Sequence, residues 1–349
     1  MKLFSFICIV LISFCFQISC TSQKAKEQKQ LNLFIWGGYF VPASVQQFEK
    51  QTGIKVNISE YNSNEELLTK LQAGASGYDI IIPSDYMVKI MIKTELLQKL
   101  DPNQLSQFSK LDPQLLNQSY DPKNEYSIPY AWSTTGIARN TSQYPEKVTS
   151  WKQVWGNKNL QNRFTMLDDP REVISAVLKT QNQSVNTMDS KALNEVKKQL
   201  KTIKPHIRAL TSDPKPYLIN GDFLVSQMFS SDALNGKYVK KGPIEYVIPE
   251  DGCTMAIDNF AIPKTAKNLK EAYEFINFNL QKEVNVEFVK IKFGGPVVMG
   301  VKELLPTEIQ NDEALFPNKK VLSRCEMIQD LGEKTSEIDQ IWTEFKVTE

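Results

Sequence analysis

Short apolar runs alternate with amphipathic helical stretches from Leu31 onward, and this alternation limits the fold more than any other feature of the 349-residue chain. The runs 31–36 and 78–83 are apolar enough for strands that are buried on both faces. The run 54–61 alternates apolar with polar residues, which is typical of a half-buried strand. Proline and glycine mark the start and the end of a helix between the first two runs. Strands that alternate with helices in this way predict an α/β fold.

Length and charge narrow the class of protein further. A chain of 349 residues is long enough for about two domains of roughly 150 residues each. Its 41 Lys and Arg residues nearly equal its 40 Asp and Glu residues, so the surface carries no strong net field. Without such a field, nucleic acid and acidic membrane surfaces are not expected partners.

An export signal peptide is predicted over residues 1–19. Its apolar segment, 3–16, is too short to span a bilayer. A small residue before Cys20 resembles a lipoprotein cleavage site, which would place a lipid on Cys20, although Gln17 departs from the usual leucine. Ordinary cleavage nearby is the alternative. The polar stretch 20–30 is expected to be a disordered tether with a reach of about 17 Å, so the mature protein is predicted on the periplasmic or extracytoplasmic face of the membrane, held by a lipid anchor.

The remaining cysteines and the single histidine bear on chemistry. Cys253 and Cys325 could form a disulfide or remain as buried free thiols. His206 is the only histidine, so neither the usual catalytic triad nor a histidine metal cluster can form. The sequence contains no glycine-rich phosphate loop, no G-x-S-x-G elbow and no C-x-x-C motif. We therefore predict no enzymatic activity, no cofactor and no metal.

Asp169 and Glu172 are the first candidates for a functional site. They stand three residues apart with Pro170 between them, so they share the first turn of a predicted helix. One interpretation is a capping box, in which Asp169 caps the helix and Glu172 reaches back to the N–H of the cap. The other is that both carboxylates face a cleft and hold a cationic ligand. These residues alone do not decide between the two.

Other candidates follow predicted strands. In open α/β sheets, ligands bind at the carboxyl ends of strands. The side chains found at three such ends are Trp36 and Tyr39, Ser84 and Tyr86, and Phe229 and Asp232. Core packing is the alternative role for the aromatic rings among them.

Asp258 lies inside the otherwise apolar run 255–262. A lone carboxylate in a strand is costly to bury unless it is paired. A local cap or turn where the chain passes between domains is one explanation for this residue, and a ligand carboxylate is the other.

Taken together, these segments resemble the substrate-binding proteins of polyamine (spermidine/putrescine) ABC transporters. The resemblance covers residues 31–346, and the stretches that carry it are FIWGGYFVP, QTGIKVNISEYNSNEELLTKL, YDIIIPSDYMV, YSIPYAW, LDDPREV and IDNFAIP. It implies a two-lobed, type II periplasmic-binding-protein-like fold, with a ligand cleft between the lobes and two chain crossovers. The implied ranges are 31–133 plus 257–303 for lobe 1, and 134–256 plus 304–349 for lobe 2.

The resemblance also implies a ligand site. The residues that fall on ligand-contacting positions of the family are Trp36, Tyr39, Ser84, Tyr86, Asp169, Glu172 and Asp258. In addition, Phe229 replaces a family tryptophan, and Asp232 matches an acidic position of putrescine-type members. The positions that depart from the family pattern are Gly37, Ala256, Gly295 and Ile328, in place of a polar residue, an aromatic residue, a tyrosine and a glutamine. These departures thin the aromatic box and the polar end of the cleft, and they put the identity of the ligand in doubt more than its class.

The predicted function is binding of a polyamine outside the cytoplasm, with delivery to a membrane permease when the cleft closes. A surface lipoprotein with lost or altered ligand specificity is the first alternative. A glycosidase that uses a pair of carboxylates is the second. A binder of anions or ferric iron is disfavoured because the cleft candidates are acidic.

Overall fold

The computed structural model describes residues 28–347 of the chain. The predicted signal peptide and Cys20 lie outside these residues. Gln30, the last residue of the predicted tether, is not part of a disordered segment, because it begins the first strand and pairs with Lys55. Within the described part of the chain, no helix is long and apolar enough to cross a membrane.

The sheet of lobe 1 has the strand order β2-β1-β3-β9-β4. β1 pairs in parallel with β2 and β3, whereas β9 runs antiparallel to both β3 and β4. The strands are β1 (Gln30–Trp36), β2 (Lys55–Tyr61), β3 (Ile80–Ile81), β9 (Cys253–Ala261) and β4 (Ser127–Asn140). The predicted α/β fold is confirmed, although β3 is shorter than the predicted run 78–83.

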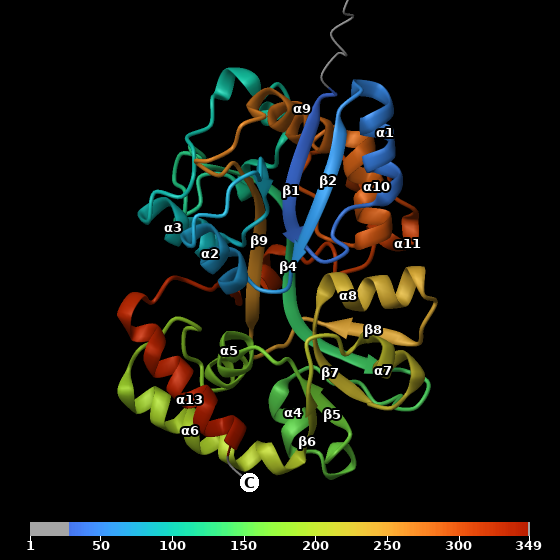
Figure 1. The fold of residues 1–349 in the computed structure, drawn as a ribbon. Helices are drawn as coiled ribbons and strands as arrows, with labels where there is room; N and C mark the ends of the chain where they lie inside the picture. The colour runs from blue at the N-terminus through green and yellow to red at the C-terminus, as the bar shows by residue number, and fades with distance from the viewer. Residues whose placement is uncertain (1–27, 348–349) are drawn as a thin grey trace, which may run out of the picture.

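Helices cover both faces of this sheet, because alternate residues of β1 point to opposite sides. Leu31, Leu33 and Ile35 pack in one core with the side chains of α1, α9 and α10. Phe34 packs on the other face with α2 and α3. The helices are α1 (Pro42–Thr52), α2 (Asn64–Gln72), α3 (Asp85–Lys93), α9 (Leu269–Asn279) and α10 (Lys282–Lys292). Figure 1 shows α2 and α3 on one side of lobe 1, and α1 and α10 on the other.

Lobe 2 extends the sheet in the order β4-β7-β5-β6, with β8 also paired to β4. Its strands are β5 (Phe164–Met166), β6 (Ile207–Leu210), β7 (Val225–Phe229) and β8 (Ile244–Val247). Its helices are α4 (Trp151–Gly156), α5 (Pro170–Thr180), α6 (Ser190–Ile203), α7 (Lys215–Asn220), α8 (Ser230–Leu234) and α13 (Thr335–Val347). A second core forms among α4, α5, α6 and α13, with Ile338, Ile341 and Phe345 of α13 buried in it.

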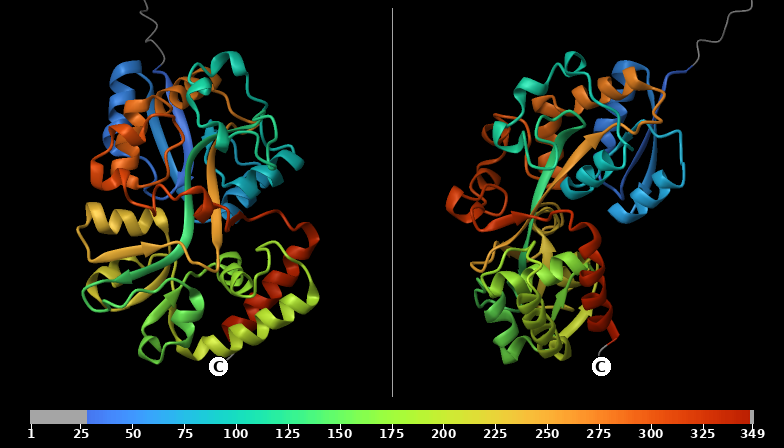
Figure 2. Two further views of the ribbon diagram at one scale, coloured as in Figure 1. Left: turned by 180° about the vertical axis from the view of Figure 1, so that it is seen from behind. Right: turned by 90° about the vertical axis from the view of Figure 1, so that its left-hand side faces the viewer.

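Two long strands carry the chain between the lobes. β4 pairs with β9 from Ser127, opposite Ala261, to Thr134, opposite Met255, and then continues into lobe 2 beside β7. Figures 1 and 2 show these strands side by side at the waist of the molecule. The predicted two-lobed fold is confirmed. Because both crossing strands belong to one ladder, any side chain on them lies close to both lobes.

The C-terminal segment crosses between the lobes once more, in addition to the two crossings on β4 and β9. α11 (Thr307–Gln310) lies beside α10 of lobe 1, and α13 lies on lobe 2 (Figure 1). Between them come α12 (Lys319–Leu322) and β10 (Cys325–Met327), which pairs with β9. A disulfide joins Cys253 of β9 to Cys325 of β10, which settles the pairing that the sequence left open.

Candidate functional site

Asp258 is the centre of the candidate site, where β9 passes between the lobes. Its Oδ1 accepts a hydrogen bond from Ser84 Oγ at 2.7 Å, and its Oδ2 accepts one from the Tyr39 hydroxyl. Tyr39 follows β1 and Ser84 precedes α3, so three predicted residues from distant parts of the sequence meet at one carboxylate. Burial raises the pKa of Asp258, and the two hydroxyl donors oppose that rise. Among residues 28–347, no Lys or Arg forms an ion pair with this carboxylate.

The first turn of α5 combines the two interpretations of Asp169 and Glu172. Asp169 is the cap, since its Oδ1 accepts a hydrogen bond from the backbone N–H of Glu172 at 3.0 Å. The Glu172 side chain does not reach back to the backbone N–H of Asp169. Its Oε2 instead accepts a hydrogen bond at 2.6 Å from Thr254 Oγ1 on the crossing strand β9. The capping box is therefore wrong in its second half, because tertiary contact with β9 offers Glu172 a buried hydroxyl donor.

The environment of Glu172 favours its neutral form. The side chain is only 5% exposed. Burial raises its pKa to about 8, and the negative charge of Asp169 acts in the same direction. The hydroxyls of Thr254 and Thr135 oppose the rise because they donate to the carboxylate. Burial likewise raises the pKa of Asp169, whereas the backbone N–H groups at the helix start lower it. A cation between these carboxylates would favour their charged forms.

Asp85 is a buried carboxylate that the sequence did not single out. It begins α3 and is 1% exposed; its oxygens accept hydrogen bonds from the backbone N–H of Tyr86 at 2.7 Å and of Ile257 at 3.4 Å. Burial raises its pKa to about 8, and the charges of Asp258 and Glu172 add to the rise. The charges of Asp258 on the crossing strand and of Glu172 in lobe 2 therefore both act on Asp85. The sequence signal that could have identified Asp85 was its position between the candidates Ser84 and Tyr86 at the end of a strand.

Tyr86 faces lobe 2 from lobe 1. Its hydroxyl donates to Glu65 Oε1 at 3.0 Å and lies 3.2 Å from Asn64 Nδ2, which also lies 3.2 Å from Ser84 Oγ. Burial raises the pKa of Tyr86, and the charges of Glu65 and Asp169 raise it further. Asp169 of lobe 2 therefore lies opposite Tyr86 and Glu65 of lobe 1. Glu65 and Asn64 are site residues that the sequence analysis missed.

The two remaining rings lie on separate lobes. Trp36 ends β1 and packs on Tyr61, with ring centroids 4.9 Å apart. Phe229 ends β7, lies opposite Thr135 on β4 and is partly exposed. Each ring occupies the strand end at which it was predicted, one in each lobe.

Asp232 has a different environment from the other predicted carboxylates. Its Oδ1 lies 2.9 Å from Lys215 Nζ, so its charge is already offset by a residue of its own lobe. The prediction that Asp232 is available to a ligand ammonium did not anticipate this pair, because the sequence does not bring α7 and α8 together.

Gly295, one of the departures from the family pattern, is explained by Trp132. The Gly295 N–H donates to Trp132 O at 2.7 Å, and Trp132 Nε1 donates to Pro296 O at 3.1 Å. A Cβ at position 295 would lie 2.1 Å from the indole ring. The Trp132 ring thus fills the space that a side chain at 295 would need, and an aromatic group remains at this place.

The other departures lie at the edges of the junction. A Cβ at Gly37 would lie 3.9 Å from Glu60 Oε2, so a carboxylate of β2 stands beside this glycine. Ala256 is partly exposed on β9, opposite Ser133. Ile328 precedes Gln329, whose carbonyl oxygen accepts a hydrogen bond from Arg171 at 3.1 Å.

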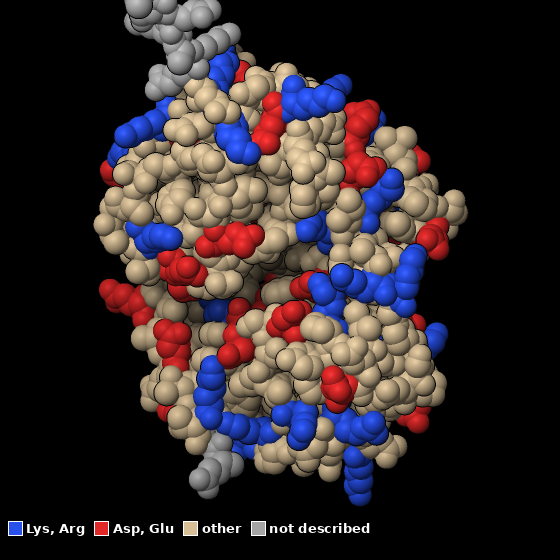
Figure 3. All heavy atoms as spheres, turned by 45° about the vertical axis from the view of Figure 1, so that its right-hand side comes forward, with Lys and Arg blue, Asp and Glu red and all other residues tan. Residues whose placement is uncertain are grey.

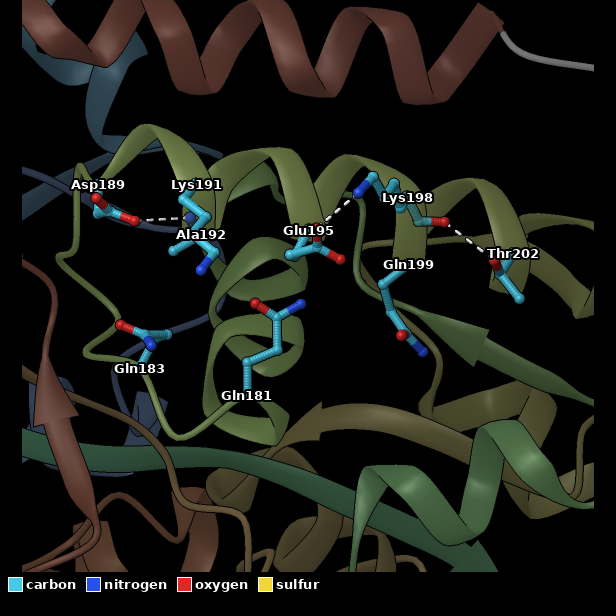
Figure 4. A pocket seen from close by; sticks show the side chains of 9 residues that line it. All are labelled: Gln181, Gln183, Asp189, Lys191, Ala192, Glu195, Lys198, Gln199 and Thr202. Carbon is cyan, nitrogen blue, oxygen red and sulfur yellow. Dashed lines mark hydrogen bonds and ion pairs between the residues drawn. The ribbon is translucent and has the colours of Figure 1, made fainter.

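The charged side chains on the molecular surface agree with a candidate site between the lobes. Figure 3 shows a hollow between the lobes, with acidic side chains on both rims and basic side chains along its right edge. A second, solvent-open groove lies on lobe 2, and it contains no predicted site residue. Figure 4 shows its lining by α6 and the loop before it, through Gln181, Gln183, Asp189, Lys191, Ala192, Glu195, Lys198, Gln199 and Thr202. Within residues 28–347, no group of three His, Cys, Asp or Glu side chains could hold a metal ion.

A two-lobed α/β fold with carboxylates converging on its waist defines a solute-binding protein. Residues 43–317 match the model of the bacterial extracellular solute-binding protein family, and this chain belongs to that family.

Relatives with known names are similar over nearly the whole chain. The spermidine/putrescine-binding periplasmic protein of Salmonella typhimurium is 33% identical over 334 residues, which cover 94% of this chain and 95% of the relative. The putrescine-binding periplasmic protein PotF of Escherichia coli is 30% identical over 342 residues, or 92% of each chain. The structure is similar to that of the spermidine/putrescine ABC transporter substrate-binding protein PotD from Streptococcus pneumoniae, with a TM-score of 0.83 and 33% identity over 91% of this chain and 98% of that one. The predicted family resemblance is confirmed, and each of these relatives is named as a binding protein.

Proposed function

We propose that this chain binds a polyamine, putrescine or spermidine, in the cleft between its lobes and delivers it to an ABC permease in the membrane. One observation carries the proposal: Asp258 of the crossing strand, which receives only hydroxyl donors, and Glu172 of lobe 2 both act on the buried Asp85. A polyamine is a chain of ammonium groups separated by a few methylenes. It offers positive charges in addition to that of Arg171, which acts on Asp169 and Glu172.

The contacts would be shared among charges and rings. Asp169, Glu172 and Asp258 would hold the ammonium groups, with Ser84 orienting Asp258. The rings that would line the methylenes and offer cation–π faces are Trp36, Tyr39, Tyr86 and Phe229. Asp232 is left out of this set because of its lysine partner.

No single contact is sufficient for tight binding. A charge-assisted hydrogen bond contributes about 1.5–3 kcal/mol, and four buried methylenes contribute roughly 3 kcal/mol. Micromolar affinity corresponds to a net binding free energy of about −8 kcal/mol. The contacts must therefore also offset an association cost on the order of 4–15 kcal/mol. The ligand must therefore engage carboxylates and rings of both lobes at once, which favours the closed arrangement of the lobes.

Closure would be a hinge motion at the crossing strands. We place the hinge at the boundaries 133/134 and 256/257, since Ser133 and Ala256 pair with each other on β4 and β9. The two lobes would then be 31–133 plus 257–303 and 134–256 plus 304–349, with α11 of the last range still lying beside α10 of lobe 1. A lipid on Cys20 would hold the protein to the membrane through the segment that precedes β1.

A thermal-shift panel of putrescine, cadaverine, spermidine and spermine tests the proposal, with calorimetry on each hit. We expect at least one polyamine to raise the melting temperature of the protein, since a ligand that binds only the folded state stabilises it. Asp258→Asn is the matched variant, and the shift should largely disappear. If none of the four amines shifts the melting temperature, a surface lipoprotein with altered specificity becomes the better explanation. Turnover of chromogenic glycosides would instead support the carboxylate-pair glycosidase.

A further inference from the structure

Asp232 is paired from within its own lobe by a lysine in a constrained position. Asp232 lies in α8, and Lys215 is the first residue of α7, between two prolines that restrict its backbone. Lys215 Nζ lies 2.9 Å from Asp232 Oδ1, and the Lys215 side chain is 22% exposed. Because both residues belong to lobe 2, closing or opening of the lobes leaves the pair intact.

Lobe 1 brings a second lysine to the same end of the junction. Lys292, the last residue of α10, donates to the carbonyl oxygen of Gly38 in the loop after β1. Burial lowers the pKa of Lys292, and the positive charge of Lys215 lowers it further, whereas Asp232 acts in the opposite direction. Lys215 and Lys292 are therefore close enough to repel each other across the lobe boundary.

The carboxylates at this end match the two lysines in number. Glu60, at the end of β2, accepts a hydrogen bond from the Gly38 N–H at 2.7 Å, and its charge also acts on Lys292. With Asp232, it balances the two ammonium groups. Asp258 is different, because the uncharged hydroxyls of Tyr39 and Ser84 donate hydrogen bonds to it.

We propose that Lys215 occupies the ammonium position at Asp232 and so determines ligand specificity, confining the positive charge of the ligand to the end of the cleft that holds Asp258 and Glu172. This inference rests on the proposed polyamine function. A carboxylate that already contacts one ammonium has little attraction left for a second, and Lys292 repels any further cation there. The protein thus favours a diamine, because the third ammonium of a longer polyamine meets at the Asp232 end a carboxylate that, within residues 28–347, is already paired with Lys215.

A double-mutant cycle with Lys215→Met and Asp232→Asn tests this assignment, with dissociation constants for putrescine and spermidine from calorimetry. Asp232→Asn alone leaves Lys215 unpaired, so this variant should bind neither amine more tightly than the parent does. Lys215→Met frees Asp232, and it should strengthen spermidine binding about tenfold while putrescine binding changes less. In the Lys215→Met background, Asp232→Asn should remove that gain.

Two further variants separate the role of Lys215 from general charge and folding effects. Lys215→Arg keeps the ion pair and should retain the parent ratio of the two constants. Lys237→Met removes an equally charged side chain from a similar pair, with Asp312 at 2.6 Å, and should also leave the ratio unchanged. Melting temperatures of all variants establish that each one folds.

The outcomes distinguish this inference from the proposed function. If the parent protein binds polyamines but Lys215→Met leaves the spermidine-to-putrescine ratio unchanged, the inference is wrong and the function stands. It is equally wrong if, in the Lys215→Met background, Asp232→Asn weakens putrescine binding as strongly as spermidine binding, because Asp232 would then also contact the diamine. If the parent protein binds none of the amines, the proposed function fails and the inference fails with it.

Discussion

Asp258 and Asp232 are two carboxylates at the junction of the lobes, and their surroundings differ in one respect. Asp258 is held by the hydroxyls of Tyr39 and Ser84, which orient a carboxylate without neutralising it. Asp232 contacts the ammonium group of Lys215. A carboxylate in a cleft can serve as a cation site only where the protein leaves the positive charge to the ligand.

The two ends of the junction differ accordingly. At the acidic end, defined by Asp85, Asp169, Glu172 and Asp258, burial raises the pKa of all four carboxyl groups. The only positive charge named among the causes of these shifts is that of Arg171, which lowers the pKa of Asp169 and of Glu172 but does not cancel the rise. At the balanced end, defined by Glu60, Asp232, Lys215 and Lys292, each sign of charge meets the other. A cationic ligand would therefore stabilise the charged carboxylates at the acidic end. At the balanced end, lysine side chains already provide positive charge.

The largest expected effect is the loss of Asp258. Asp258→Asn should weaken polyamine binding by about 2–5 kcal/mol, because one partner of a buried charge pair is removed. Calorimetry on this variant and on Asp232→Asn compares the two ends directly. Binding by Asp258→Asn within about twofold of the parent would contradict the assignment, since that difference is well under 1 kcal/mol.

Proton release should be the next largest effect. Glu172 has a pKa of about 8, and an ammonium group beside it favours its charged form, so the complex holds fewer protons than its parts. Affinity should therefore rise with pH below about 8, by at most tenfold per pH unit for each proton released. Calorimetry in buffers of different ionisation enthalpy counts the protons. Glu172→Gln should lower that count, and an unchanged count would show that another group titrates.

The same acids should act oppositely on the stability of the ligand-free protein. Asp85 and Glu172 have folded-state pKa values of about 8, far above the values near 4 of unfolded chains. Between these limits the folded state holds more protons, so the free energy of unfolding should fall as the pH rises, by at most about 1.4 kcal/mol per pH unit for each group. Urea unfolding from about pH 5 to pH 8 measures this slope, which should be shallower with saturating ligand. A stability that rises over this range would contradict the protonated state of the acidic end.

The smallest expected effect concerns a residue that does not touch the ligand. Thr254→Val removes the hydroxyl donor of Glu172 and makes its carboxylate harder to ionise, so binding at neutral pH should weaken by about 1 kcal/mol. Thr134→Val is the matched control, since the Thr134 hydroxyl pairs with Tyr246 instead. Equal losses in both variants would mean that packing, and not the state of Glu172, is responsible.

Local pattern predicted a large part of the fold and of the site. The run of apolar residues in β1 and the proline at the start of α5 are signals within a few residues of each other, and the structure contains both elements. The strand-end rule predicted that Tyr39 and Ser84 lie near a candidate ligand site, and both contact Asp258. The disulfide between Cys253 and Cys325 stayed open, because their spacing of 72 residues carries no geometric information.

The sequence by itself determined the alternation of strands and helices, the cap at Asp169 and the positions of candidate side chains at strand ends, since each depends on neighbouring residues. Only the tertiary structure decided how the carboxylates are used. It turned Glu172 toward Thr254, 82 residues away, and it set Lys215 against Asp232. These partners lie in contact because the folded backbone brings separate elements together. Those contacts decide whether a carboxylate already has a positively charged partner within the protein.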